Sequence, residues 1–163
     1  MGRTPVGRHE LPALPVPLTI AKRSPASKPR KLPRVNTLIV ILGAGLGGGF
    51  RHGVNVAVAR LLPGLGFPLA TLVINVLGSF LMGVLAEGFA LRGAASHPAR
   101  LFLTTGVLGG FTTFSTFSLD AVALYQRGET GAAMAYVLAS VAAGLLGLVA
   151  GLALVRAVLS GAP

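Results

Sequence analysis

Three long runs without a charged residue, and a fourth that is interrupted only by Arg51, dominate this chain. Two of them, 61–86 and 130–155, contain 26 residues each, and 101–119 contains 19. A further run begins at Val35 and continues past Arg51 to Ala59. A helix of about 20 apolar residues crosses the roughly 30 Å of hydrocarbon in a bilayer. The runs therefore predict four membrane-spanning helices, at about residues 35–59, 67–90, 99–126 and 130–157.

A soluble bundle of buried helices is the alternative for such runs. That fold needs a polar face that repeats every 3.6 residues, and the runs have no charged face. Only 11% of the residues are charged, and the 4 acidic residues are too few for a globular surface. Backbone groups in lipid must be bonded within the chain, which excludes open strands. We therefore predict an all-α membrane protein.

Residues 1–34 differ from the rest of the chain. They hold seven of the 11 prolines and eight of the 14 Lys and Arg residues, without an apolar run. Proline removes an N–H and disfavours helix in the residue before it. We expect a disordered basic extension here, then a four-helix domain at 35–158 and a short tail at 159–163. Because the positive charge is concentrated in the extension, it does not indicate a nucleic-acid partner.

No residue pattern indicates an enzyme. The chain has no cysteine, so it has neither a thiolate metal site nor a Cys nucleophile. The sequence contains no nucleotide-binding motif, catalytic triad or metal cluster. No acid lies in the first helix and no acid–His chain runs through the core, which argues against a proton-coupled pump.

The third run carries the most informative residues. It contains Gly109 and Gly110, with Ser and Thr residues close on both sides. Each glycine weakens a helix by about 1 kcal/mol relative to Ala, and hydroxyls can satisfy backbone groups that a break frees. We expect the third helix to be broken at this glycine pair in mid-membrane, with an ion site at the break. A flexible, well-packed Gly-rich helix is the alternative.

Two other helices carry polar stripes with a spacing of four residues. Neutral donors such as the Asn amide suit an anion that must lose water and still leave. Hydrogen bonds between helices, worth about 0.6 kcal/mol on average, explain the stripes equally well, and both interpretations stay open. The stripes are Thr71, Asn75 and Ser79 in the second helix and Tyr136, Ser140 and Gly144 in the fourth.

Phe114 and Phe117 are three residues apart and therefore share a helix face. The positive edges of their rings suit a small anion, although such pairs more often face lipid or the core. Arg51 would either attract anions to a vestibule or extend to the lipid headgroups. Because four helices enclose little interior, we also expect an oligomer. Close helix packing is predicted where glycines lie four apart, at Gly43/Gly47, Gly45/Gly49 and Gly147/Gly151.

The strings TLVINVLGSF at 71–80 and GGFTTFSTF at 109–117 closely resemble those of the bacterial fluoride channels called Fluc or CrcB. The resemblance extends over about residues 35–158. It implies a fluoride-specific channel of the inner (plasma) membrane, which passively exports fluoride from the cytoplasm and so reduces its toxicity. It also implies an antiparallel homodimer in the lipid, with two fluoride pathways at the subunit interface and a structural Na⁺ that is not transported.

The resemblance implies roles for single residues as well. Backbone carbonyls of Gly109 and Thr112 would hold the Na⁺, since hard oxygens suit this ion, and Arg51 would lie at the vestibule. Gly144 departs from the family, in which some members have a hydroxyl at this position. The fluoride pathway would be lined by Thr71, Asn75, Phe114, Ser115, Thr116, Phe117, Tyr136 and Ser140.

Two other functions compete with this interpretation. A small four-helix multidrug or cation exporter also works as an antiparallel dimer, but it needs a membrane-embedded carboxylate, and the first helix has none. A helper subunit would leave the hydroxyl-rich break without a purpose. The basic extension favours a cytoplasmic N-terminus, whereas an antiparallel dimer needs both orientations. A weaker effect of the extension, a later start or a second homologous chain as partner would remove this conflict.

Overall fold

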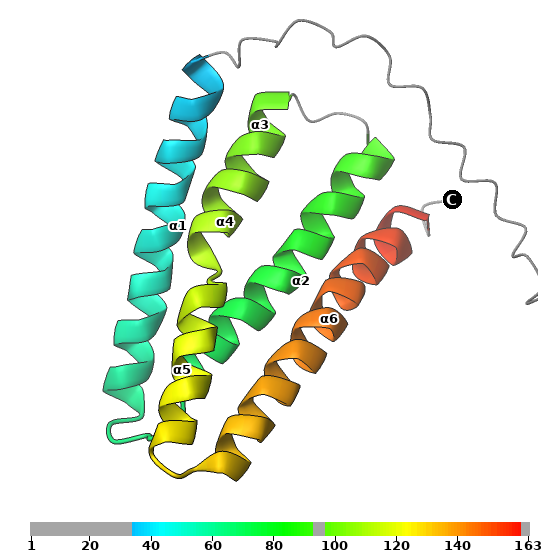
Figure 1. The fold of residues 1–163 in the computed structure, drawn as a ribbon. Helices are drawn as coiled ribbons and strands as arrows, with labels where there is room; N and C mark the ends of the chain where they lie inside the picture. The colour runs from blue at the N-terminus through cyan, green and yellow to red at the C-terminus, as the bar shows by residue number, and fades with distance from the viewer. Residues whose placement is uncertain (1–33, 93–96, 161–163) are drawn as a thin grey trace, which may run out of the picture. The chain divides into compact units, whose positions relative to one another are not determined.

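The computed structural model describes residues 34–92 and 97–160, and these residues form four helical spans (Figure 1). Three spans are single helices: α1 (Arg34–Leu61), α2 (Leu69–Arg92) and α6 (Thr130–Ser160). The third span consists of four shorter pieces: α3 (His97–Leu101), η1 (Phe102–Leu108), α4 (Gly109–Phe111) and α5 (Phe114–Gln126).

All four spans are long and apolar enough to cross a membrane, and they confirm the predicted all-α membrane fold. Apart from Arg34, the predicted basic extension lies outside the described residues, as do residues 161–163 of the predicted tail. The candidate membrane segments are Val35–Leu61, Leu69–Leu91, His97–Gln126 and Thr130–Leu159, whose ends lie within a few residues of those predicted.

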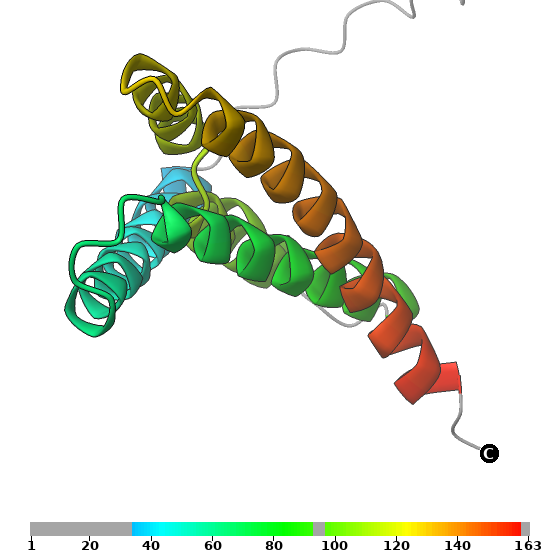
Figure 2. The same cartoon turned by 90° about the horizontal axis from the view of Figure 1, so that it is seen from below.

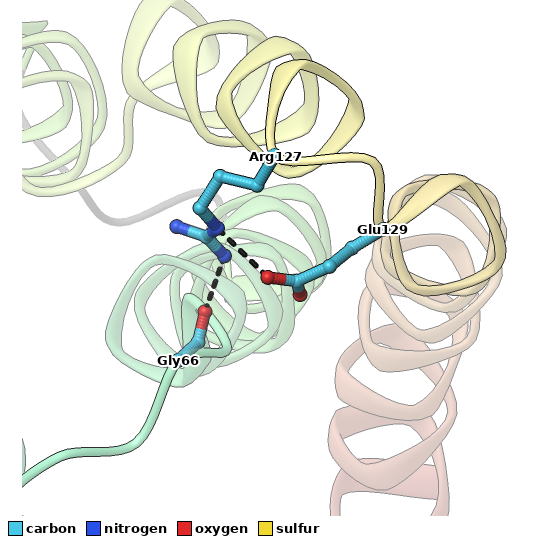
Figure 3. A network of polar contacts seen from close by, with 3 residues as sticks. All are labelled: Gly66, Arg127 and Glu129. Carbon is cyan, nitrogen blue, oxygen red and sulfur yellow. Dashed lines mark hydrogen bonds and ion pairs between the residues drawn. The ribbon is translucent and has the colours of Figure 1, made fainter.

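Two short turns connect the spans at the same end of the helices. Gly64 in the turn between α1 and α2 has a φ of 79°, and Gly128 in the turn between α5 and α6 has a φ of 80°. Glycine is the residue that adopts such positive values most readily. Arg127 joins the two turns, because its Nε donates to Glu129 Oε1 at 2.9 Å and its Nη2 donates to the Gly66 carbonyl at 2.7 Å (Figure 3).

The helices α2 and α6 lie side by side and run in the same direction (Figures 1 and 2). Their backbones approach so closely that a Cβ added at Gly83 would overlap the carbonyl of Leu148. A Cβ at Gly151 would likewise overlap the carbonyl of Phe80, and one at Gly147 would also be crowded. The close packing predicted for Gly147 and Gly151 is confirmed.

An ion pair ties α2 to α6 near their C-terminal ends. Arg156 Nε lies 2.7 Å from Glu87 Oε1, and Arg156 Nη2 donates to Glu87 Oε2 at 3.2 Å. The Glu87 side chain is only 11% exposed. A carboxylate in such a place is costly unless it is paired, so the bidentate arginine is what allows Glu87 to lie within this span.

α1 packs against the first half of the third span, along η1 and α4. A Cβ added at Gly43 would lie 2.8 Å from Gly106 Cα, and one added at Gly47 would overlap the Val107 carbonyl, which confirms the packing predicted for this pair. Beside Gly45 and Gly49, by contrast, an added Cβ would meet no described atom within 4 Å. The predicted close packing of that second pair is wrong within this chain.

The third span is interrupted at Thr112 and Thr113 rather than at the glycine pair (Figure 1). Gly109 is helical, with φ −63° and ψ −37°, whereas Thr112 and Thr113 are extended, with ψ of 157° and 119°. The prediction of a break at Gly109 and Gly110 is therefore wrong in its position. Gly110 serves packing instead, since an added Cβ there would overlap the backbone of Ala44 on α1.

The interruption lets the two halves of the third span pack against different neighbours. η1 and α4 lie against α1, whereas α5 lies against α6. η1 is a stretch of π-helix, a form with wider turns that the sequence pattern did not predict. Leu124, Ala133 and Tyr136 form a small core where α5 meets α6. Large apolar side chains such as Leu42 and Leu146 are exposed, as expected of helices that face lipid or a partner.

Candidate functional site

Asn75 holds the interrupted backbone at two points. Its Oδ1 accepts a hydrogen bond from Thr113 N at 3.0 Å, and its Nδ2 donates to Thr113 O at 3.2 Å. The amide has two N–H donors, and only one of them has a partner among the described residues. Asn75 therefore fixes the break from the side of α2.

The hydroxyl groups after the break cap α5. Thr113 Oγ1 accepts from Thr116 N at 3.3 Å, which is the usual bond of a Thr at a helix N-terminus. The same oxygen lies 3.2 Å from Ser115 Oγ and 3.2 Å from Thr116 Oγ1. Ser115 and Thr116, both predicted to line the pathway, thus belong to a capping cluster around Thr113.

Several backbone carbonyls at the break, those of Gly109 and Thr112 among them, lose the donors that a continuous helix would give them. In such a helix Gly109 O would accept from Thr113 N, and Thr112 O would accept from Thr116 N. Both N–H groups are used elsewhere, since Thr113 N donates to Asn75 and Thr116 N donates to Thr113 Oγ1. Gly109 and Thr112 therefore each keep a carbonyl oxygen for another partner.

A groove of about 430 Å³ lies beside the break, between α2, α5 and α6. Its surface is mainly apolar, and we call it the polar groove because amide and hydroxyl side chains also line it. It brings together Asn75, Phe114, Phe117 and Ser140, four of the residues predicted to line the pathway. The Ser140 side chain is 8% exposed, and its Oγ has no hydrogen-bond partner among the described residues. The groove is lined by Asn75, Gly78, Ser79, Met82, Thr112, Thr113, Phe114, Phe117, Ser140, Val141 and Leu148.

An aromatic row leads from the groove into the core. The ring centroids of Phe114 and Phe117 are 5.5 Å apart, and those of Phe117 and Tyr136 are 5.4 Å apart. Phe67 meets Tyr136 edge-on at 5.6 Å. Phe114 is 80% exposed at one end of the row, whereas Tyr136 is fully buried. Phe114 is thus the ring most free to meet a ligand or a second subunit.

Asp120 lies in the third span and joins two residues that were predicted to line the pathway. Thr71 donates to Asp120 Oδ2 at 2.7 Å, and the Tyr136 hydroxyl donates to the same oxygen at 3.3 Å. Neither Thr71 nor Tyr136 lines the polar groove. Sequence reasoning missed this carboxylate as a site residue, although Asp120 lies three residues after Phe117 and so near its helix face.

Arg51, predicted at the vestibule, lies on α1 and is partly exposed. It is not among the residues that line the polar groove. The groove also contains Gly78, Met82, Thr113, Val141 and Leu148, which were not predicted to belong to the site, and Ser79, whose stripe was left open between an anion pathway and helix packing. For Ser79 a signal was available, because it continues the spacing of Thr71 and Asn75.

Comparison with known proteins matches residues 38–152 to the family described as CrcB-like protein, Camphor Resistance (CrcB). The fluoride-specific ion channel FluC of Methylobacterium nodulans is 59% identical over 122 residues, which are 75% of this chain and 97% of that protein. FluC of Rhodopseudomonas palustris is 56% identical over 121 residues, 74% of this chain and 97% of that protein. FluC of Granulibacter bethesdensis is 52% identical over 125 residues, 76% and 97% of the two chains. The chain belongs to the CrcB family, the family of the FluC ion channels.

Proposed function

We propose that this protein is a fluoride-specific ion channel and a multi-pass protein of the plasma membrane. The three relatives above carry that name and are matched over 97% of their length. The observation that best supports the proposal is the polar groove, in which neutral donors and ring edges meet and no acidic side chain is among the lining residues. The family is one of ion channels, and the protein is not an enzyme.

An anion in the groove has to exchange water for protein donors and then leave again. The donors are the second N–H of Asn75 and the hydroxyl of Ser140, which has no hydrogen-bond partner in the described part of the chain. The rings of Phe114 and Phe117 add positively polarised edges. Since none of these groups is a full cation, binding stays weak enough for an ion to move on, which conduction requires.

The other residues predicted for the pathway support its walls and ends. Thr71 and Tyr136 hold the carboxylate of Asp120 at one end of the aromatic row. Ser115 and Thr116 contact the hydroxyl of Thr113, which caps α5. They therefore help to fix the direction of α5, the helix that carries Phe114 and Phe117. In this proposal Arg51 acts farther away, as a positive charge that attracts anions to the entrance.

The proposed assembly is an antiparallel homodimer. A single chain leaves Phe114 80% exposed beside the polar groove, so the pathway lacks a wall on that side. A second copy in the opposite orientation would present the same surface again, as a twofold interface requires. Two pathways, one for each groove, follow from this symmetry.

A structural Na⁺ completes the proposed assembly at the break. The carbonyls of Gly109 and Thr112 are hard oxygens without helical donors, which suits this ion. Among the described residues no cluster of three or more His, Cys, Asp or Glu exists that would favour a divalent metal. Bound Na⁺ would supply the positive charge that these carbonyls need in the low dielectric of the membrane.

Passive conduction would move fluoride out of the cytoplasm and so reduce its toxicity. The inside-negative membrane potential favours exit by about 2.3 kcal/mol per charge for every 100 mV. A proton-coupled exporter, the alternative, needs a carboxylate that alternates between proton and substrate. Asp120 is in a suitable span, but it is bonded to Thr71 and Tyr136.

Efflux from liposomes tests the proposed function directly. The purified full-length protein is reconstituted into liposomes loaded with potassium fluoride or potassium chloride, and a potassium ionophore starts the release. We expect rapid fluoride efflux without an imposed proton gradient, and chloride retention in the matched liposomes. Release of both anions would contradict the specificity. Release only with a proton gradient would favour the exporter.

A further inference from the structure

Ser79 and Gly144 lie next to each other where α2 packs against α6. A Cβ added at Gly144 would lie 3.6 Å from Ser79 Oγ, an ordinary contact distance. The same register recurs one turn farther on, where Gly83 lies against Leu148. Because Ser79 follows Asn75 by four residues, its side chain lies about 6 Å farther along the groove, at the next level of the stripe.

The hydroxyl of Ser79 has no partner within the described chain. Ser79 lines the polar groove, and its Oγ takes part in no hydrogen bond among the described residues. The lining residues beyond it, Met82 on α2 and Leu148 on α6, are apolar. Gly144 has no side chain to offer. A polar ligand in this stretch of the groove therefore finds its side-chain donor on α2.

We propose that Ser79 coordinates fluoride, supplying from α2 the hydroxyl that Gly144 does not supply from α6. This inference rests on the proposed function, which it deepens by adding a pathway residue. A hydroxyl can replace one water of the ion's hydration shell. Thr112 lies against Gly78 in the same groove, but its hydroxyl donates to the Leu108 carbonyl at 3.0 Å. Without Ser79 a fluoride that has passed Asn75 and Ser140 would therefore meet no uncommitted side-chain hydroxyl among the described residues, and shedding water there would raise the barrier to conduction.

Moving the hydroxyl between the two helices tests this role. The variants are Ser79→Ala, Gly144→Ser and the double variant, each reconstituted for fluoride efflux. Ser79→Ala should slow efflux about tenfold, as expected for the loss of one hydrogen bond to an ion. The double variant should recover most of the wild-type rate, because a side chain at Gly144 starts within contact distance of the Ser79 position.

Thr104→Val is the matched control. It removes a hydroxyl that donates to the Arg100 carbonyl at 2.8 Å in its own span, away from the groove, and efflux should not change. Size-exclusion profiles verify that every variant assembles as the wild type does. If the wild type conducts and Ser79→Ala conducts equally well, or if the double variant stays as slow as the single one, Ser79 has no such role. If the wild type releases no fluoride, the proposed function itself is wrong and this inference falls with it.

Discussion

The Asn75 side chain both holds the third span in place and lines the polar groove. Its two hydrogen bonds satisfy the backbone N–H and C=O of Thr113 at the break. In a membrane no water replaces such bonds, so each unsatisfied backbone group would be costly. A residue that the sequence marks as a pathway donor is therefore also one of the residues that define the fold.

Asn75→Ala should lower the thermal stability of the protein. The change leaves Thr113 N and Thr113 O without partners, and we expect a loss of about 1–3 kcal/mol. Asn55→Ala is the control, since Asn55 is exposed on α1 and makes no hydrogen bond with the described residues. Thermal melting in detergent, monitored by circular dichroism, measures the stability of both variants. Equal melting temperatures for the two variants would show that Asn75 does not hold the break.

Phe114→Ile and Phe117→Ile should each slow fluoride efflux about tenfold or more, while the protein still assembles. Isoleucine keeps much of the bulk but removes the positively polarised ring edge. Phe50→Ile is the matched control, because Phe50 is an exposed phenylalanine on α1 and does not line the groove. Normal efflux in both groove variants would remove the aromatic pair from the mechanism.

The spacing of residues along a helix allowed part of the site to be predicted. A step of four residues places Asn75 one turn from Thr71, and Ser140 one turn from Tyr136. Spacing says nothing about which residue of another helix lies opposite. The bonds from Thr71 and Tyr136 to Asp120 span 49 and 16 positions and depend on helix register, so the sequence pattern did not predict them.

At the scale of helices, glycines decide which pairs of backbones come close. Gly83 and Gly151 let α2 meet α6, and Gly43 lets α1 meet η1. The close approach strengthens the dispersion attraction between the helices, which replaces the hydrophobic driving force that is weak in lipid. Gly45 has the same spacing in the sequence but lies on an open face, so the pattern alone does not identify the packed glycines.

Gly83→Ala should destabilise the protein, whereas Gly88→Ala should not. Both positions are on α2, but a Cβ at Gly83 would overlap the Leu148 carbonyl, and one at Gly88 would meet no atom of the described residues within 4 Å. At an open position alanine favours the helix by about 1 kcal/mol relative to glycine. Melting curves of the two variants in detergent make the comparison. A Gly83→Ala protein as stable as the wild type would mean that α2 and α6 are not tightly packed there.

The positions of the helix ends followed from the charged residues and turn residues that bound each apolar run. The position of the break could not be predicted in this way, because it depends on contacts between helices. Gly110 stays helical while it packs against Ala44, and Thr113 leaves the helix because Asn75 takes its N–H. The glycine content therefore identified the span that is interrupted. The position of the interruption is set by the hydrogen bond from Thr113 N to Asn75 on the neighbouring helix.

At the scale of the whole molecule, the described chain would supply only one side of the proposed fluoride pathway. The polar groove opens at a surface where Phe114 is exposed, and the carbonyls freed at the break lie only a few residues away in the sequence. Two copies in opposite orientations would close both grooves and bring two breaks together. The unpaired Gly109 and Thr112 carbonyls of both subunits would then meet in a space that excludes water.

Fluoride conduction should depend on Na⁺ bound during preparation, without Na⁺ being conducted. Removing the ion would leave about four carbonyl oxygens facing one another at the dimer axis, and their repulsion in a low dielectric would loosen the break that positions Phe114 and Asn75. Protein purified and assayed with a large organic cation in place of Na⁺ should therefore lose fluoride efflux and regain it when Na⁺ returns. Uptake of radioactive sodium into the same liposomes should stay at the level of protein-free liposomes throughout. Full efflux without Na⁺, or sodium uptake that rises with fluoride flux, would rule out a structural ion at this position.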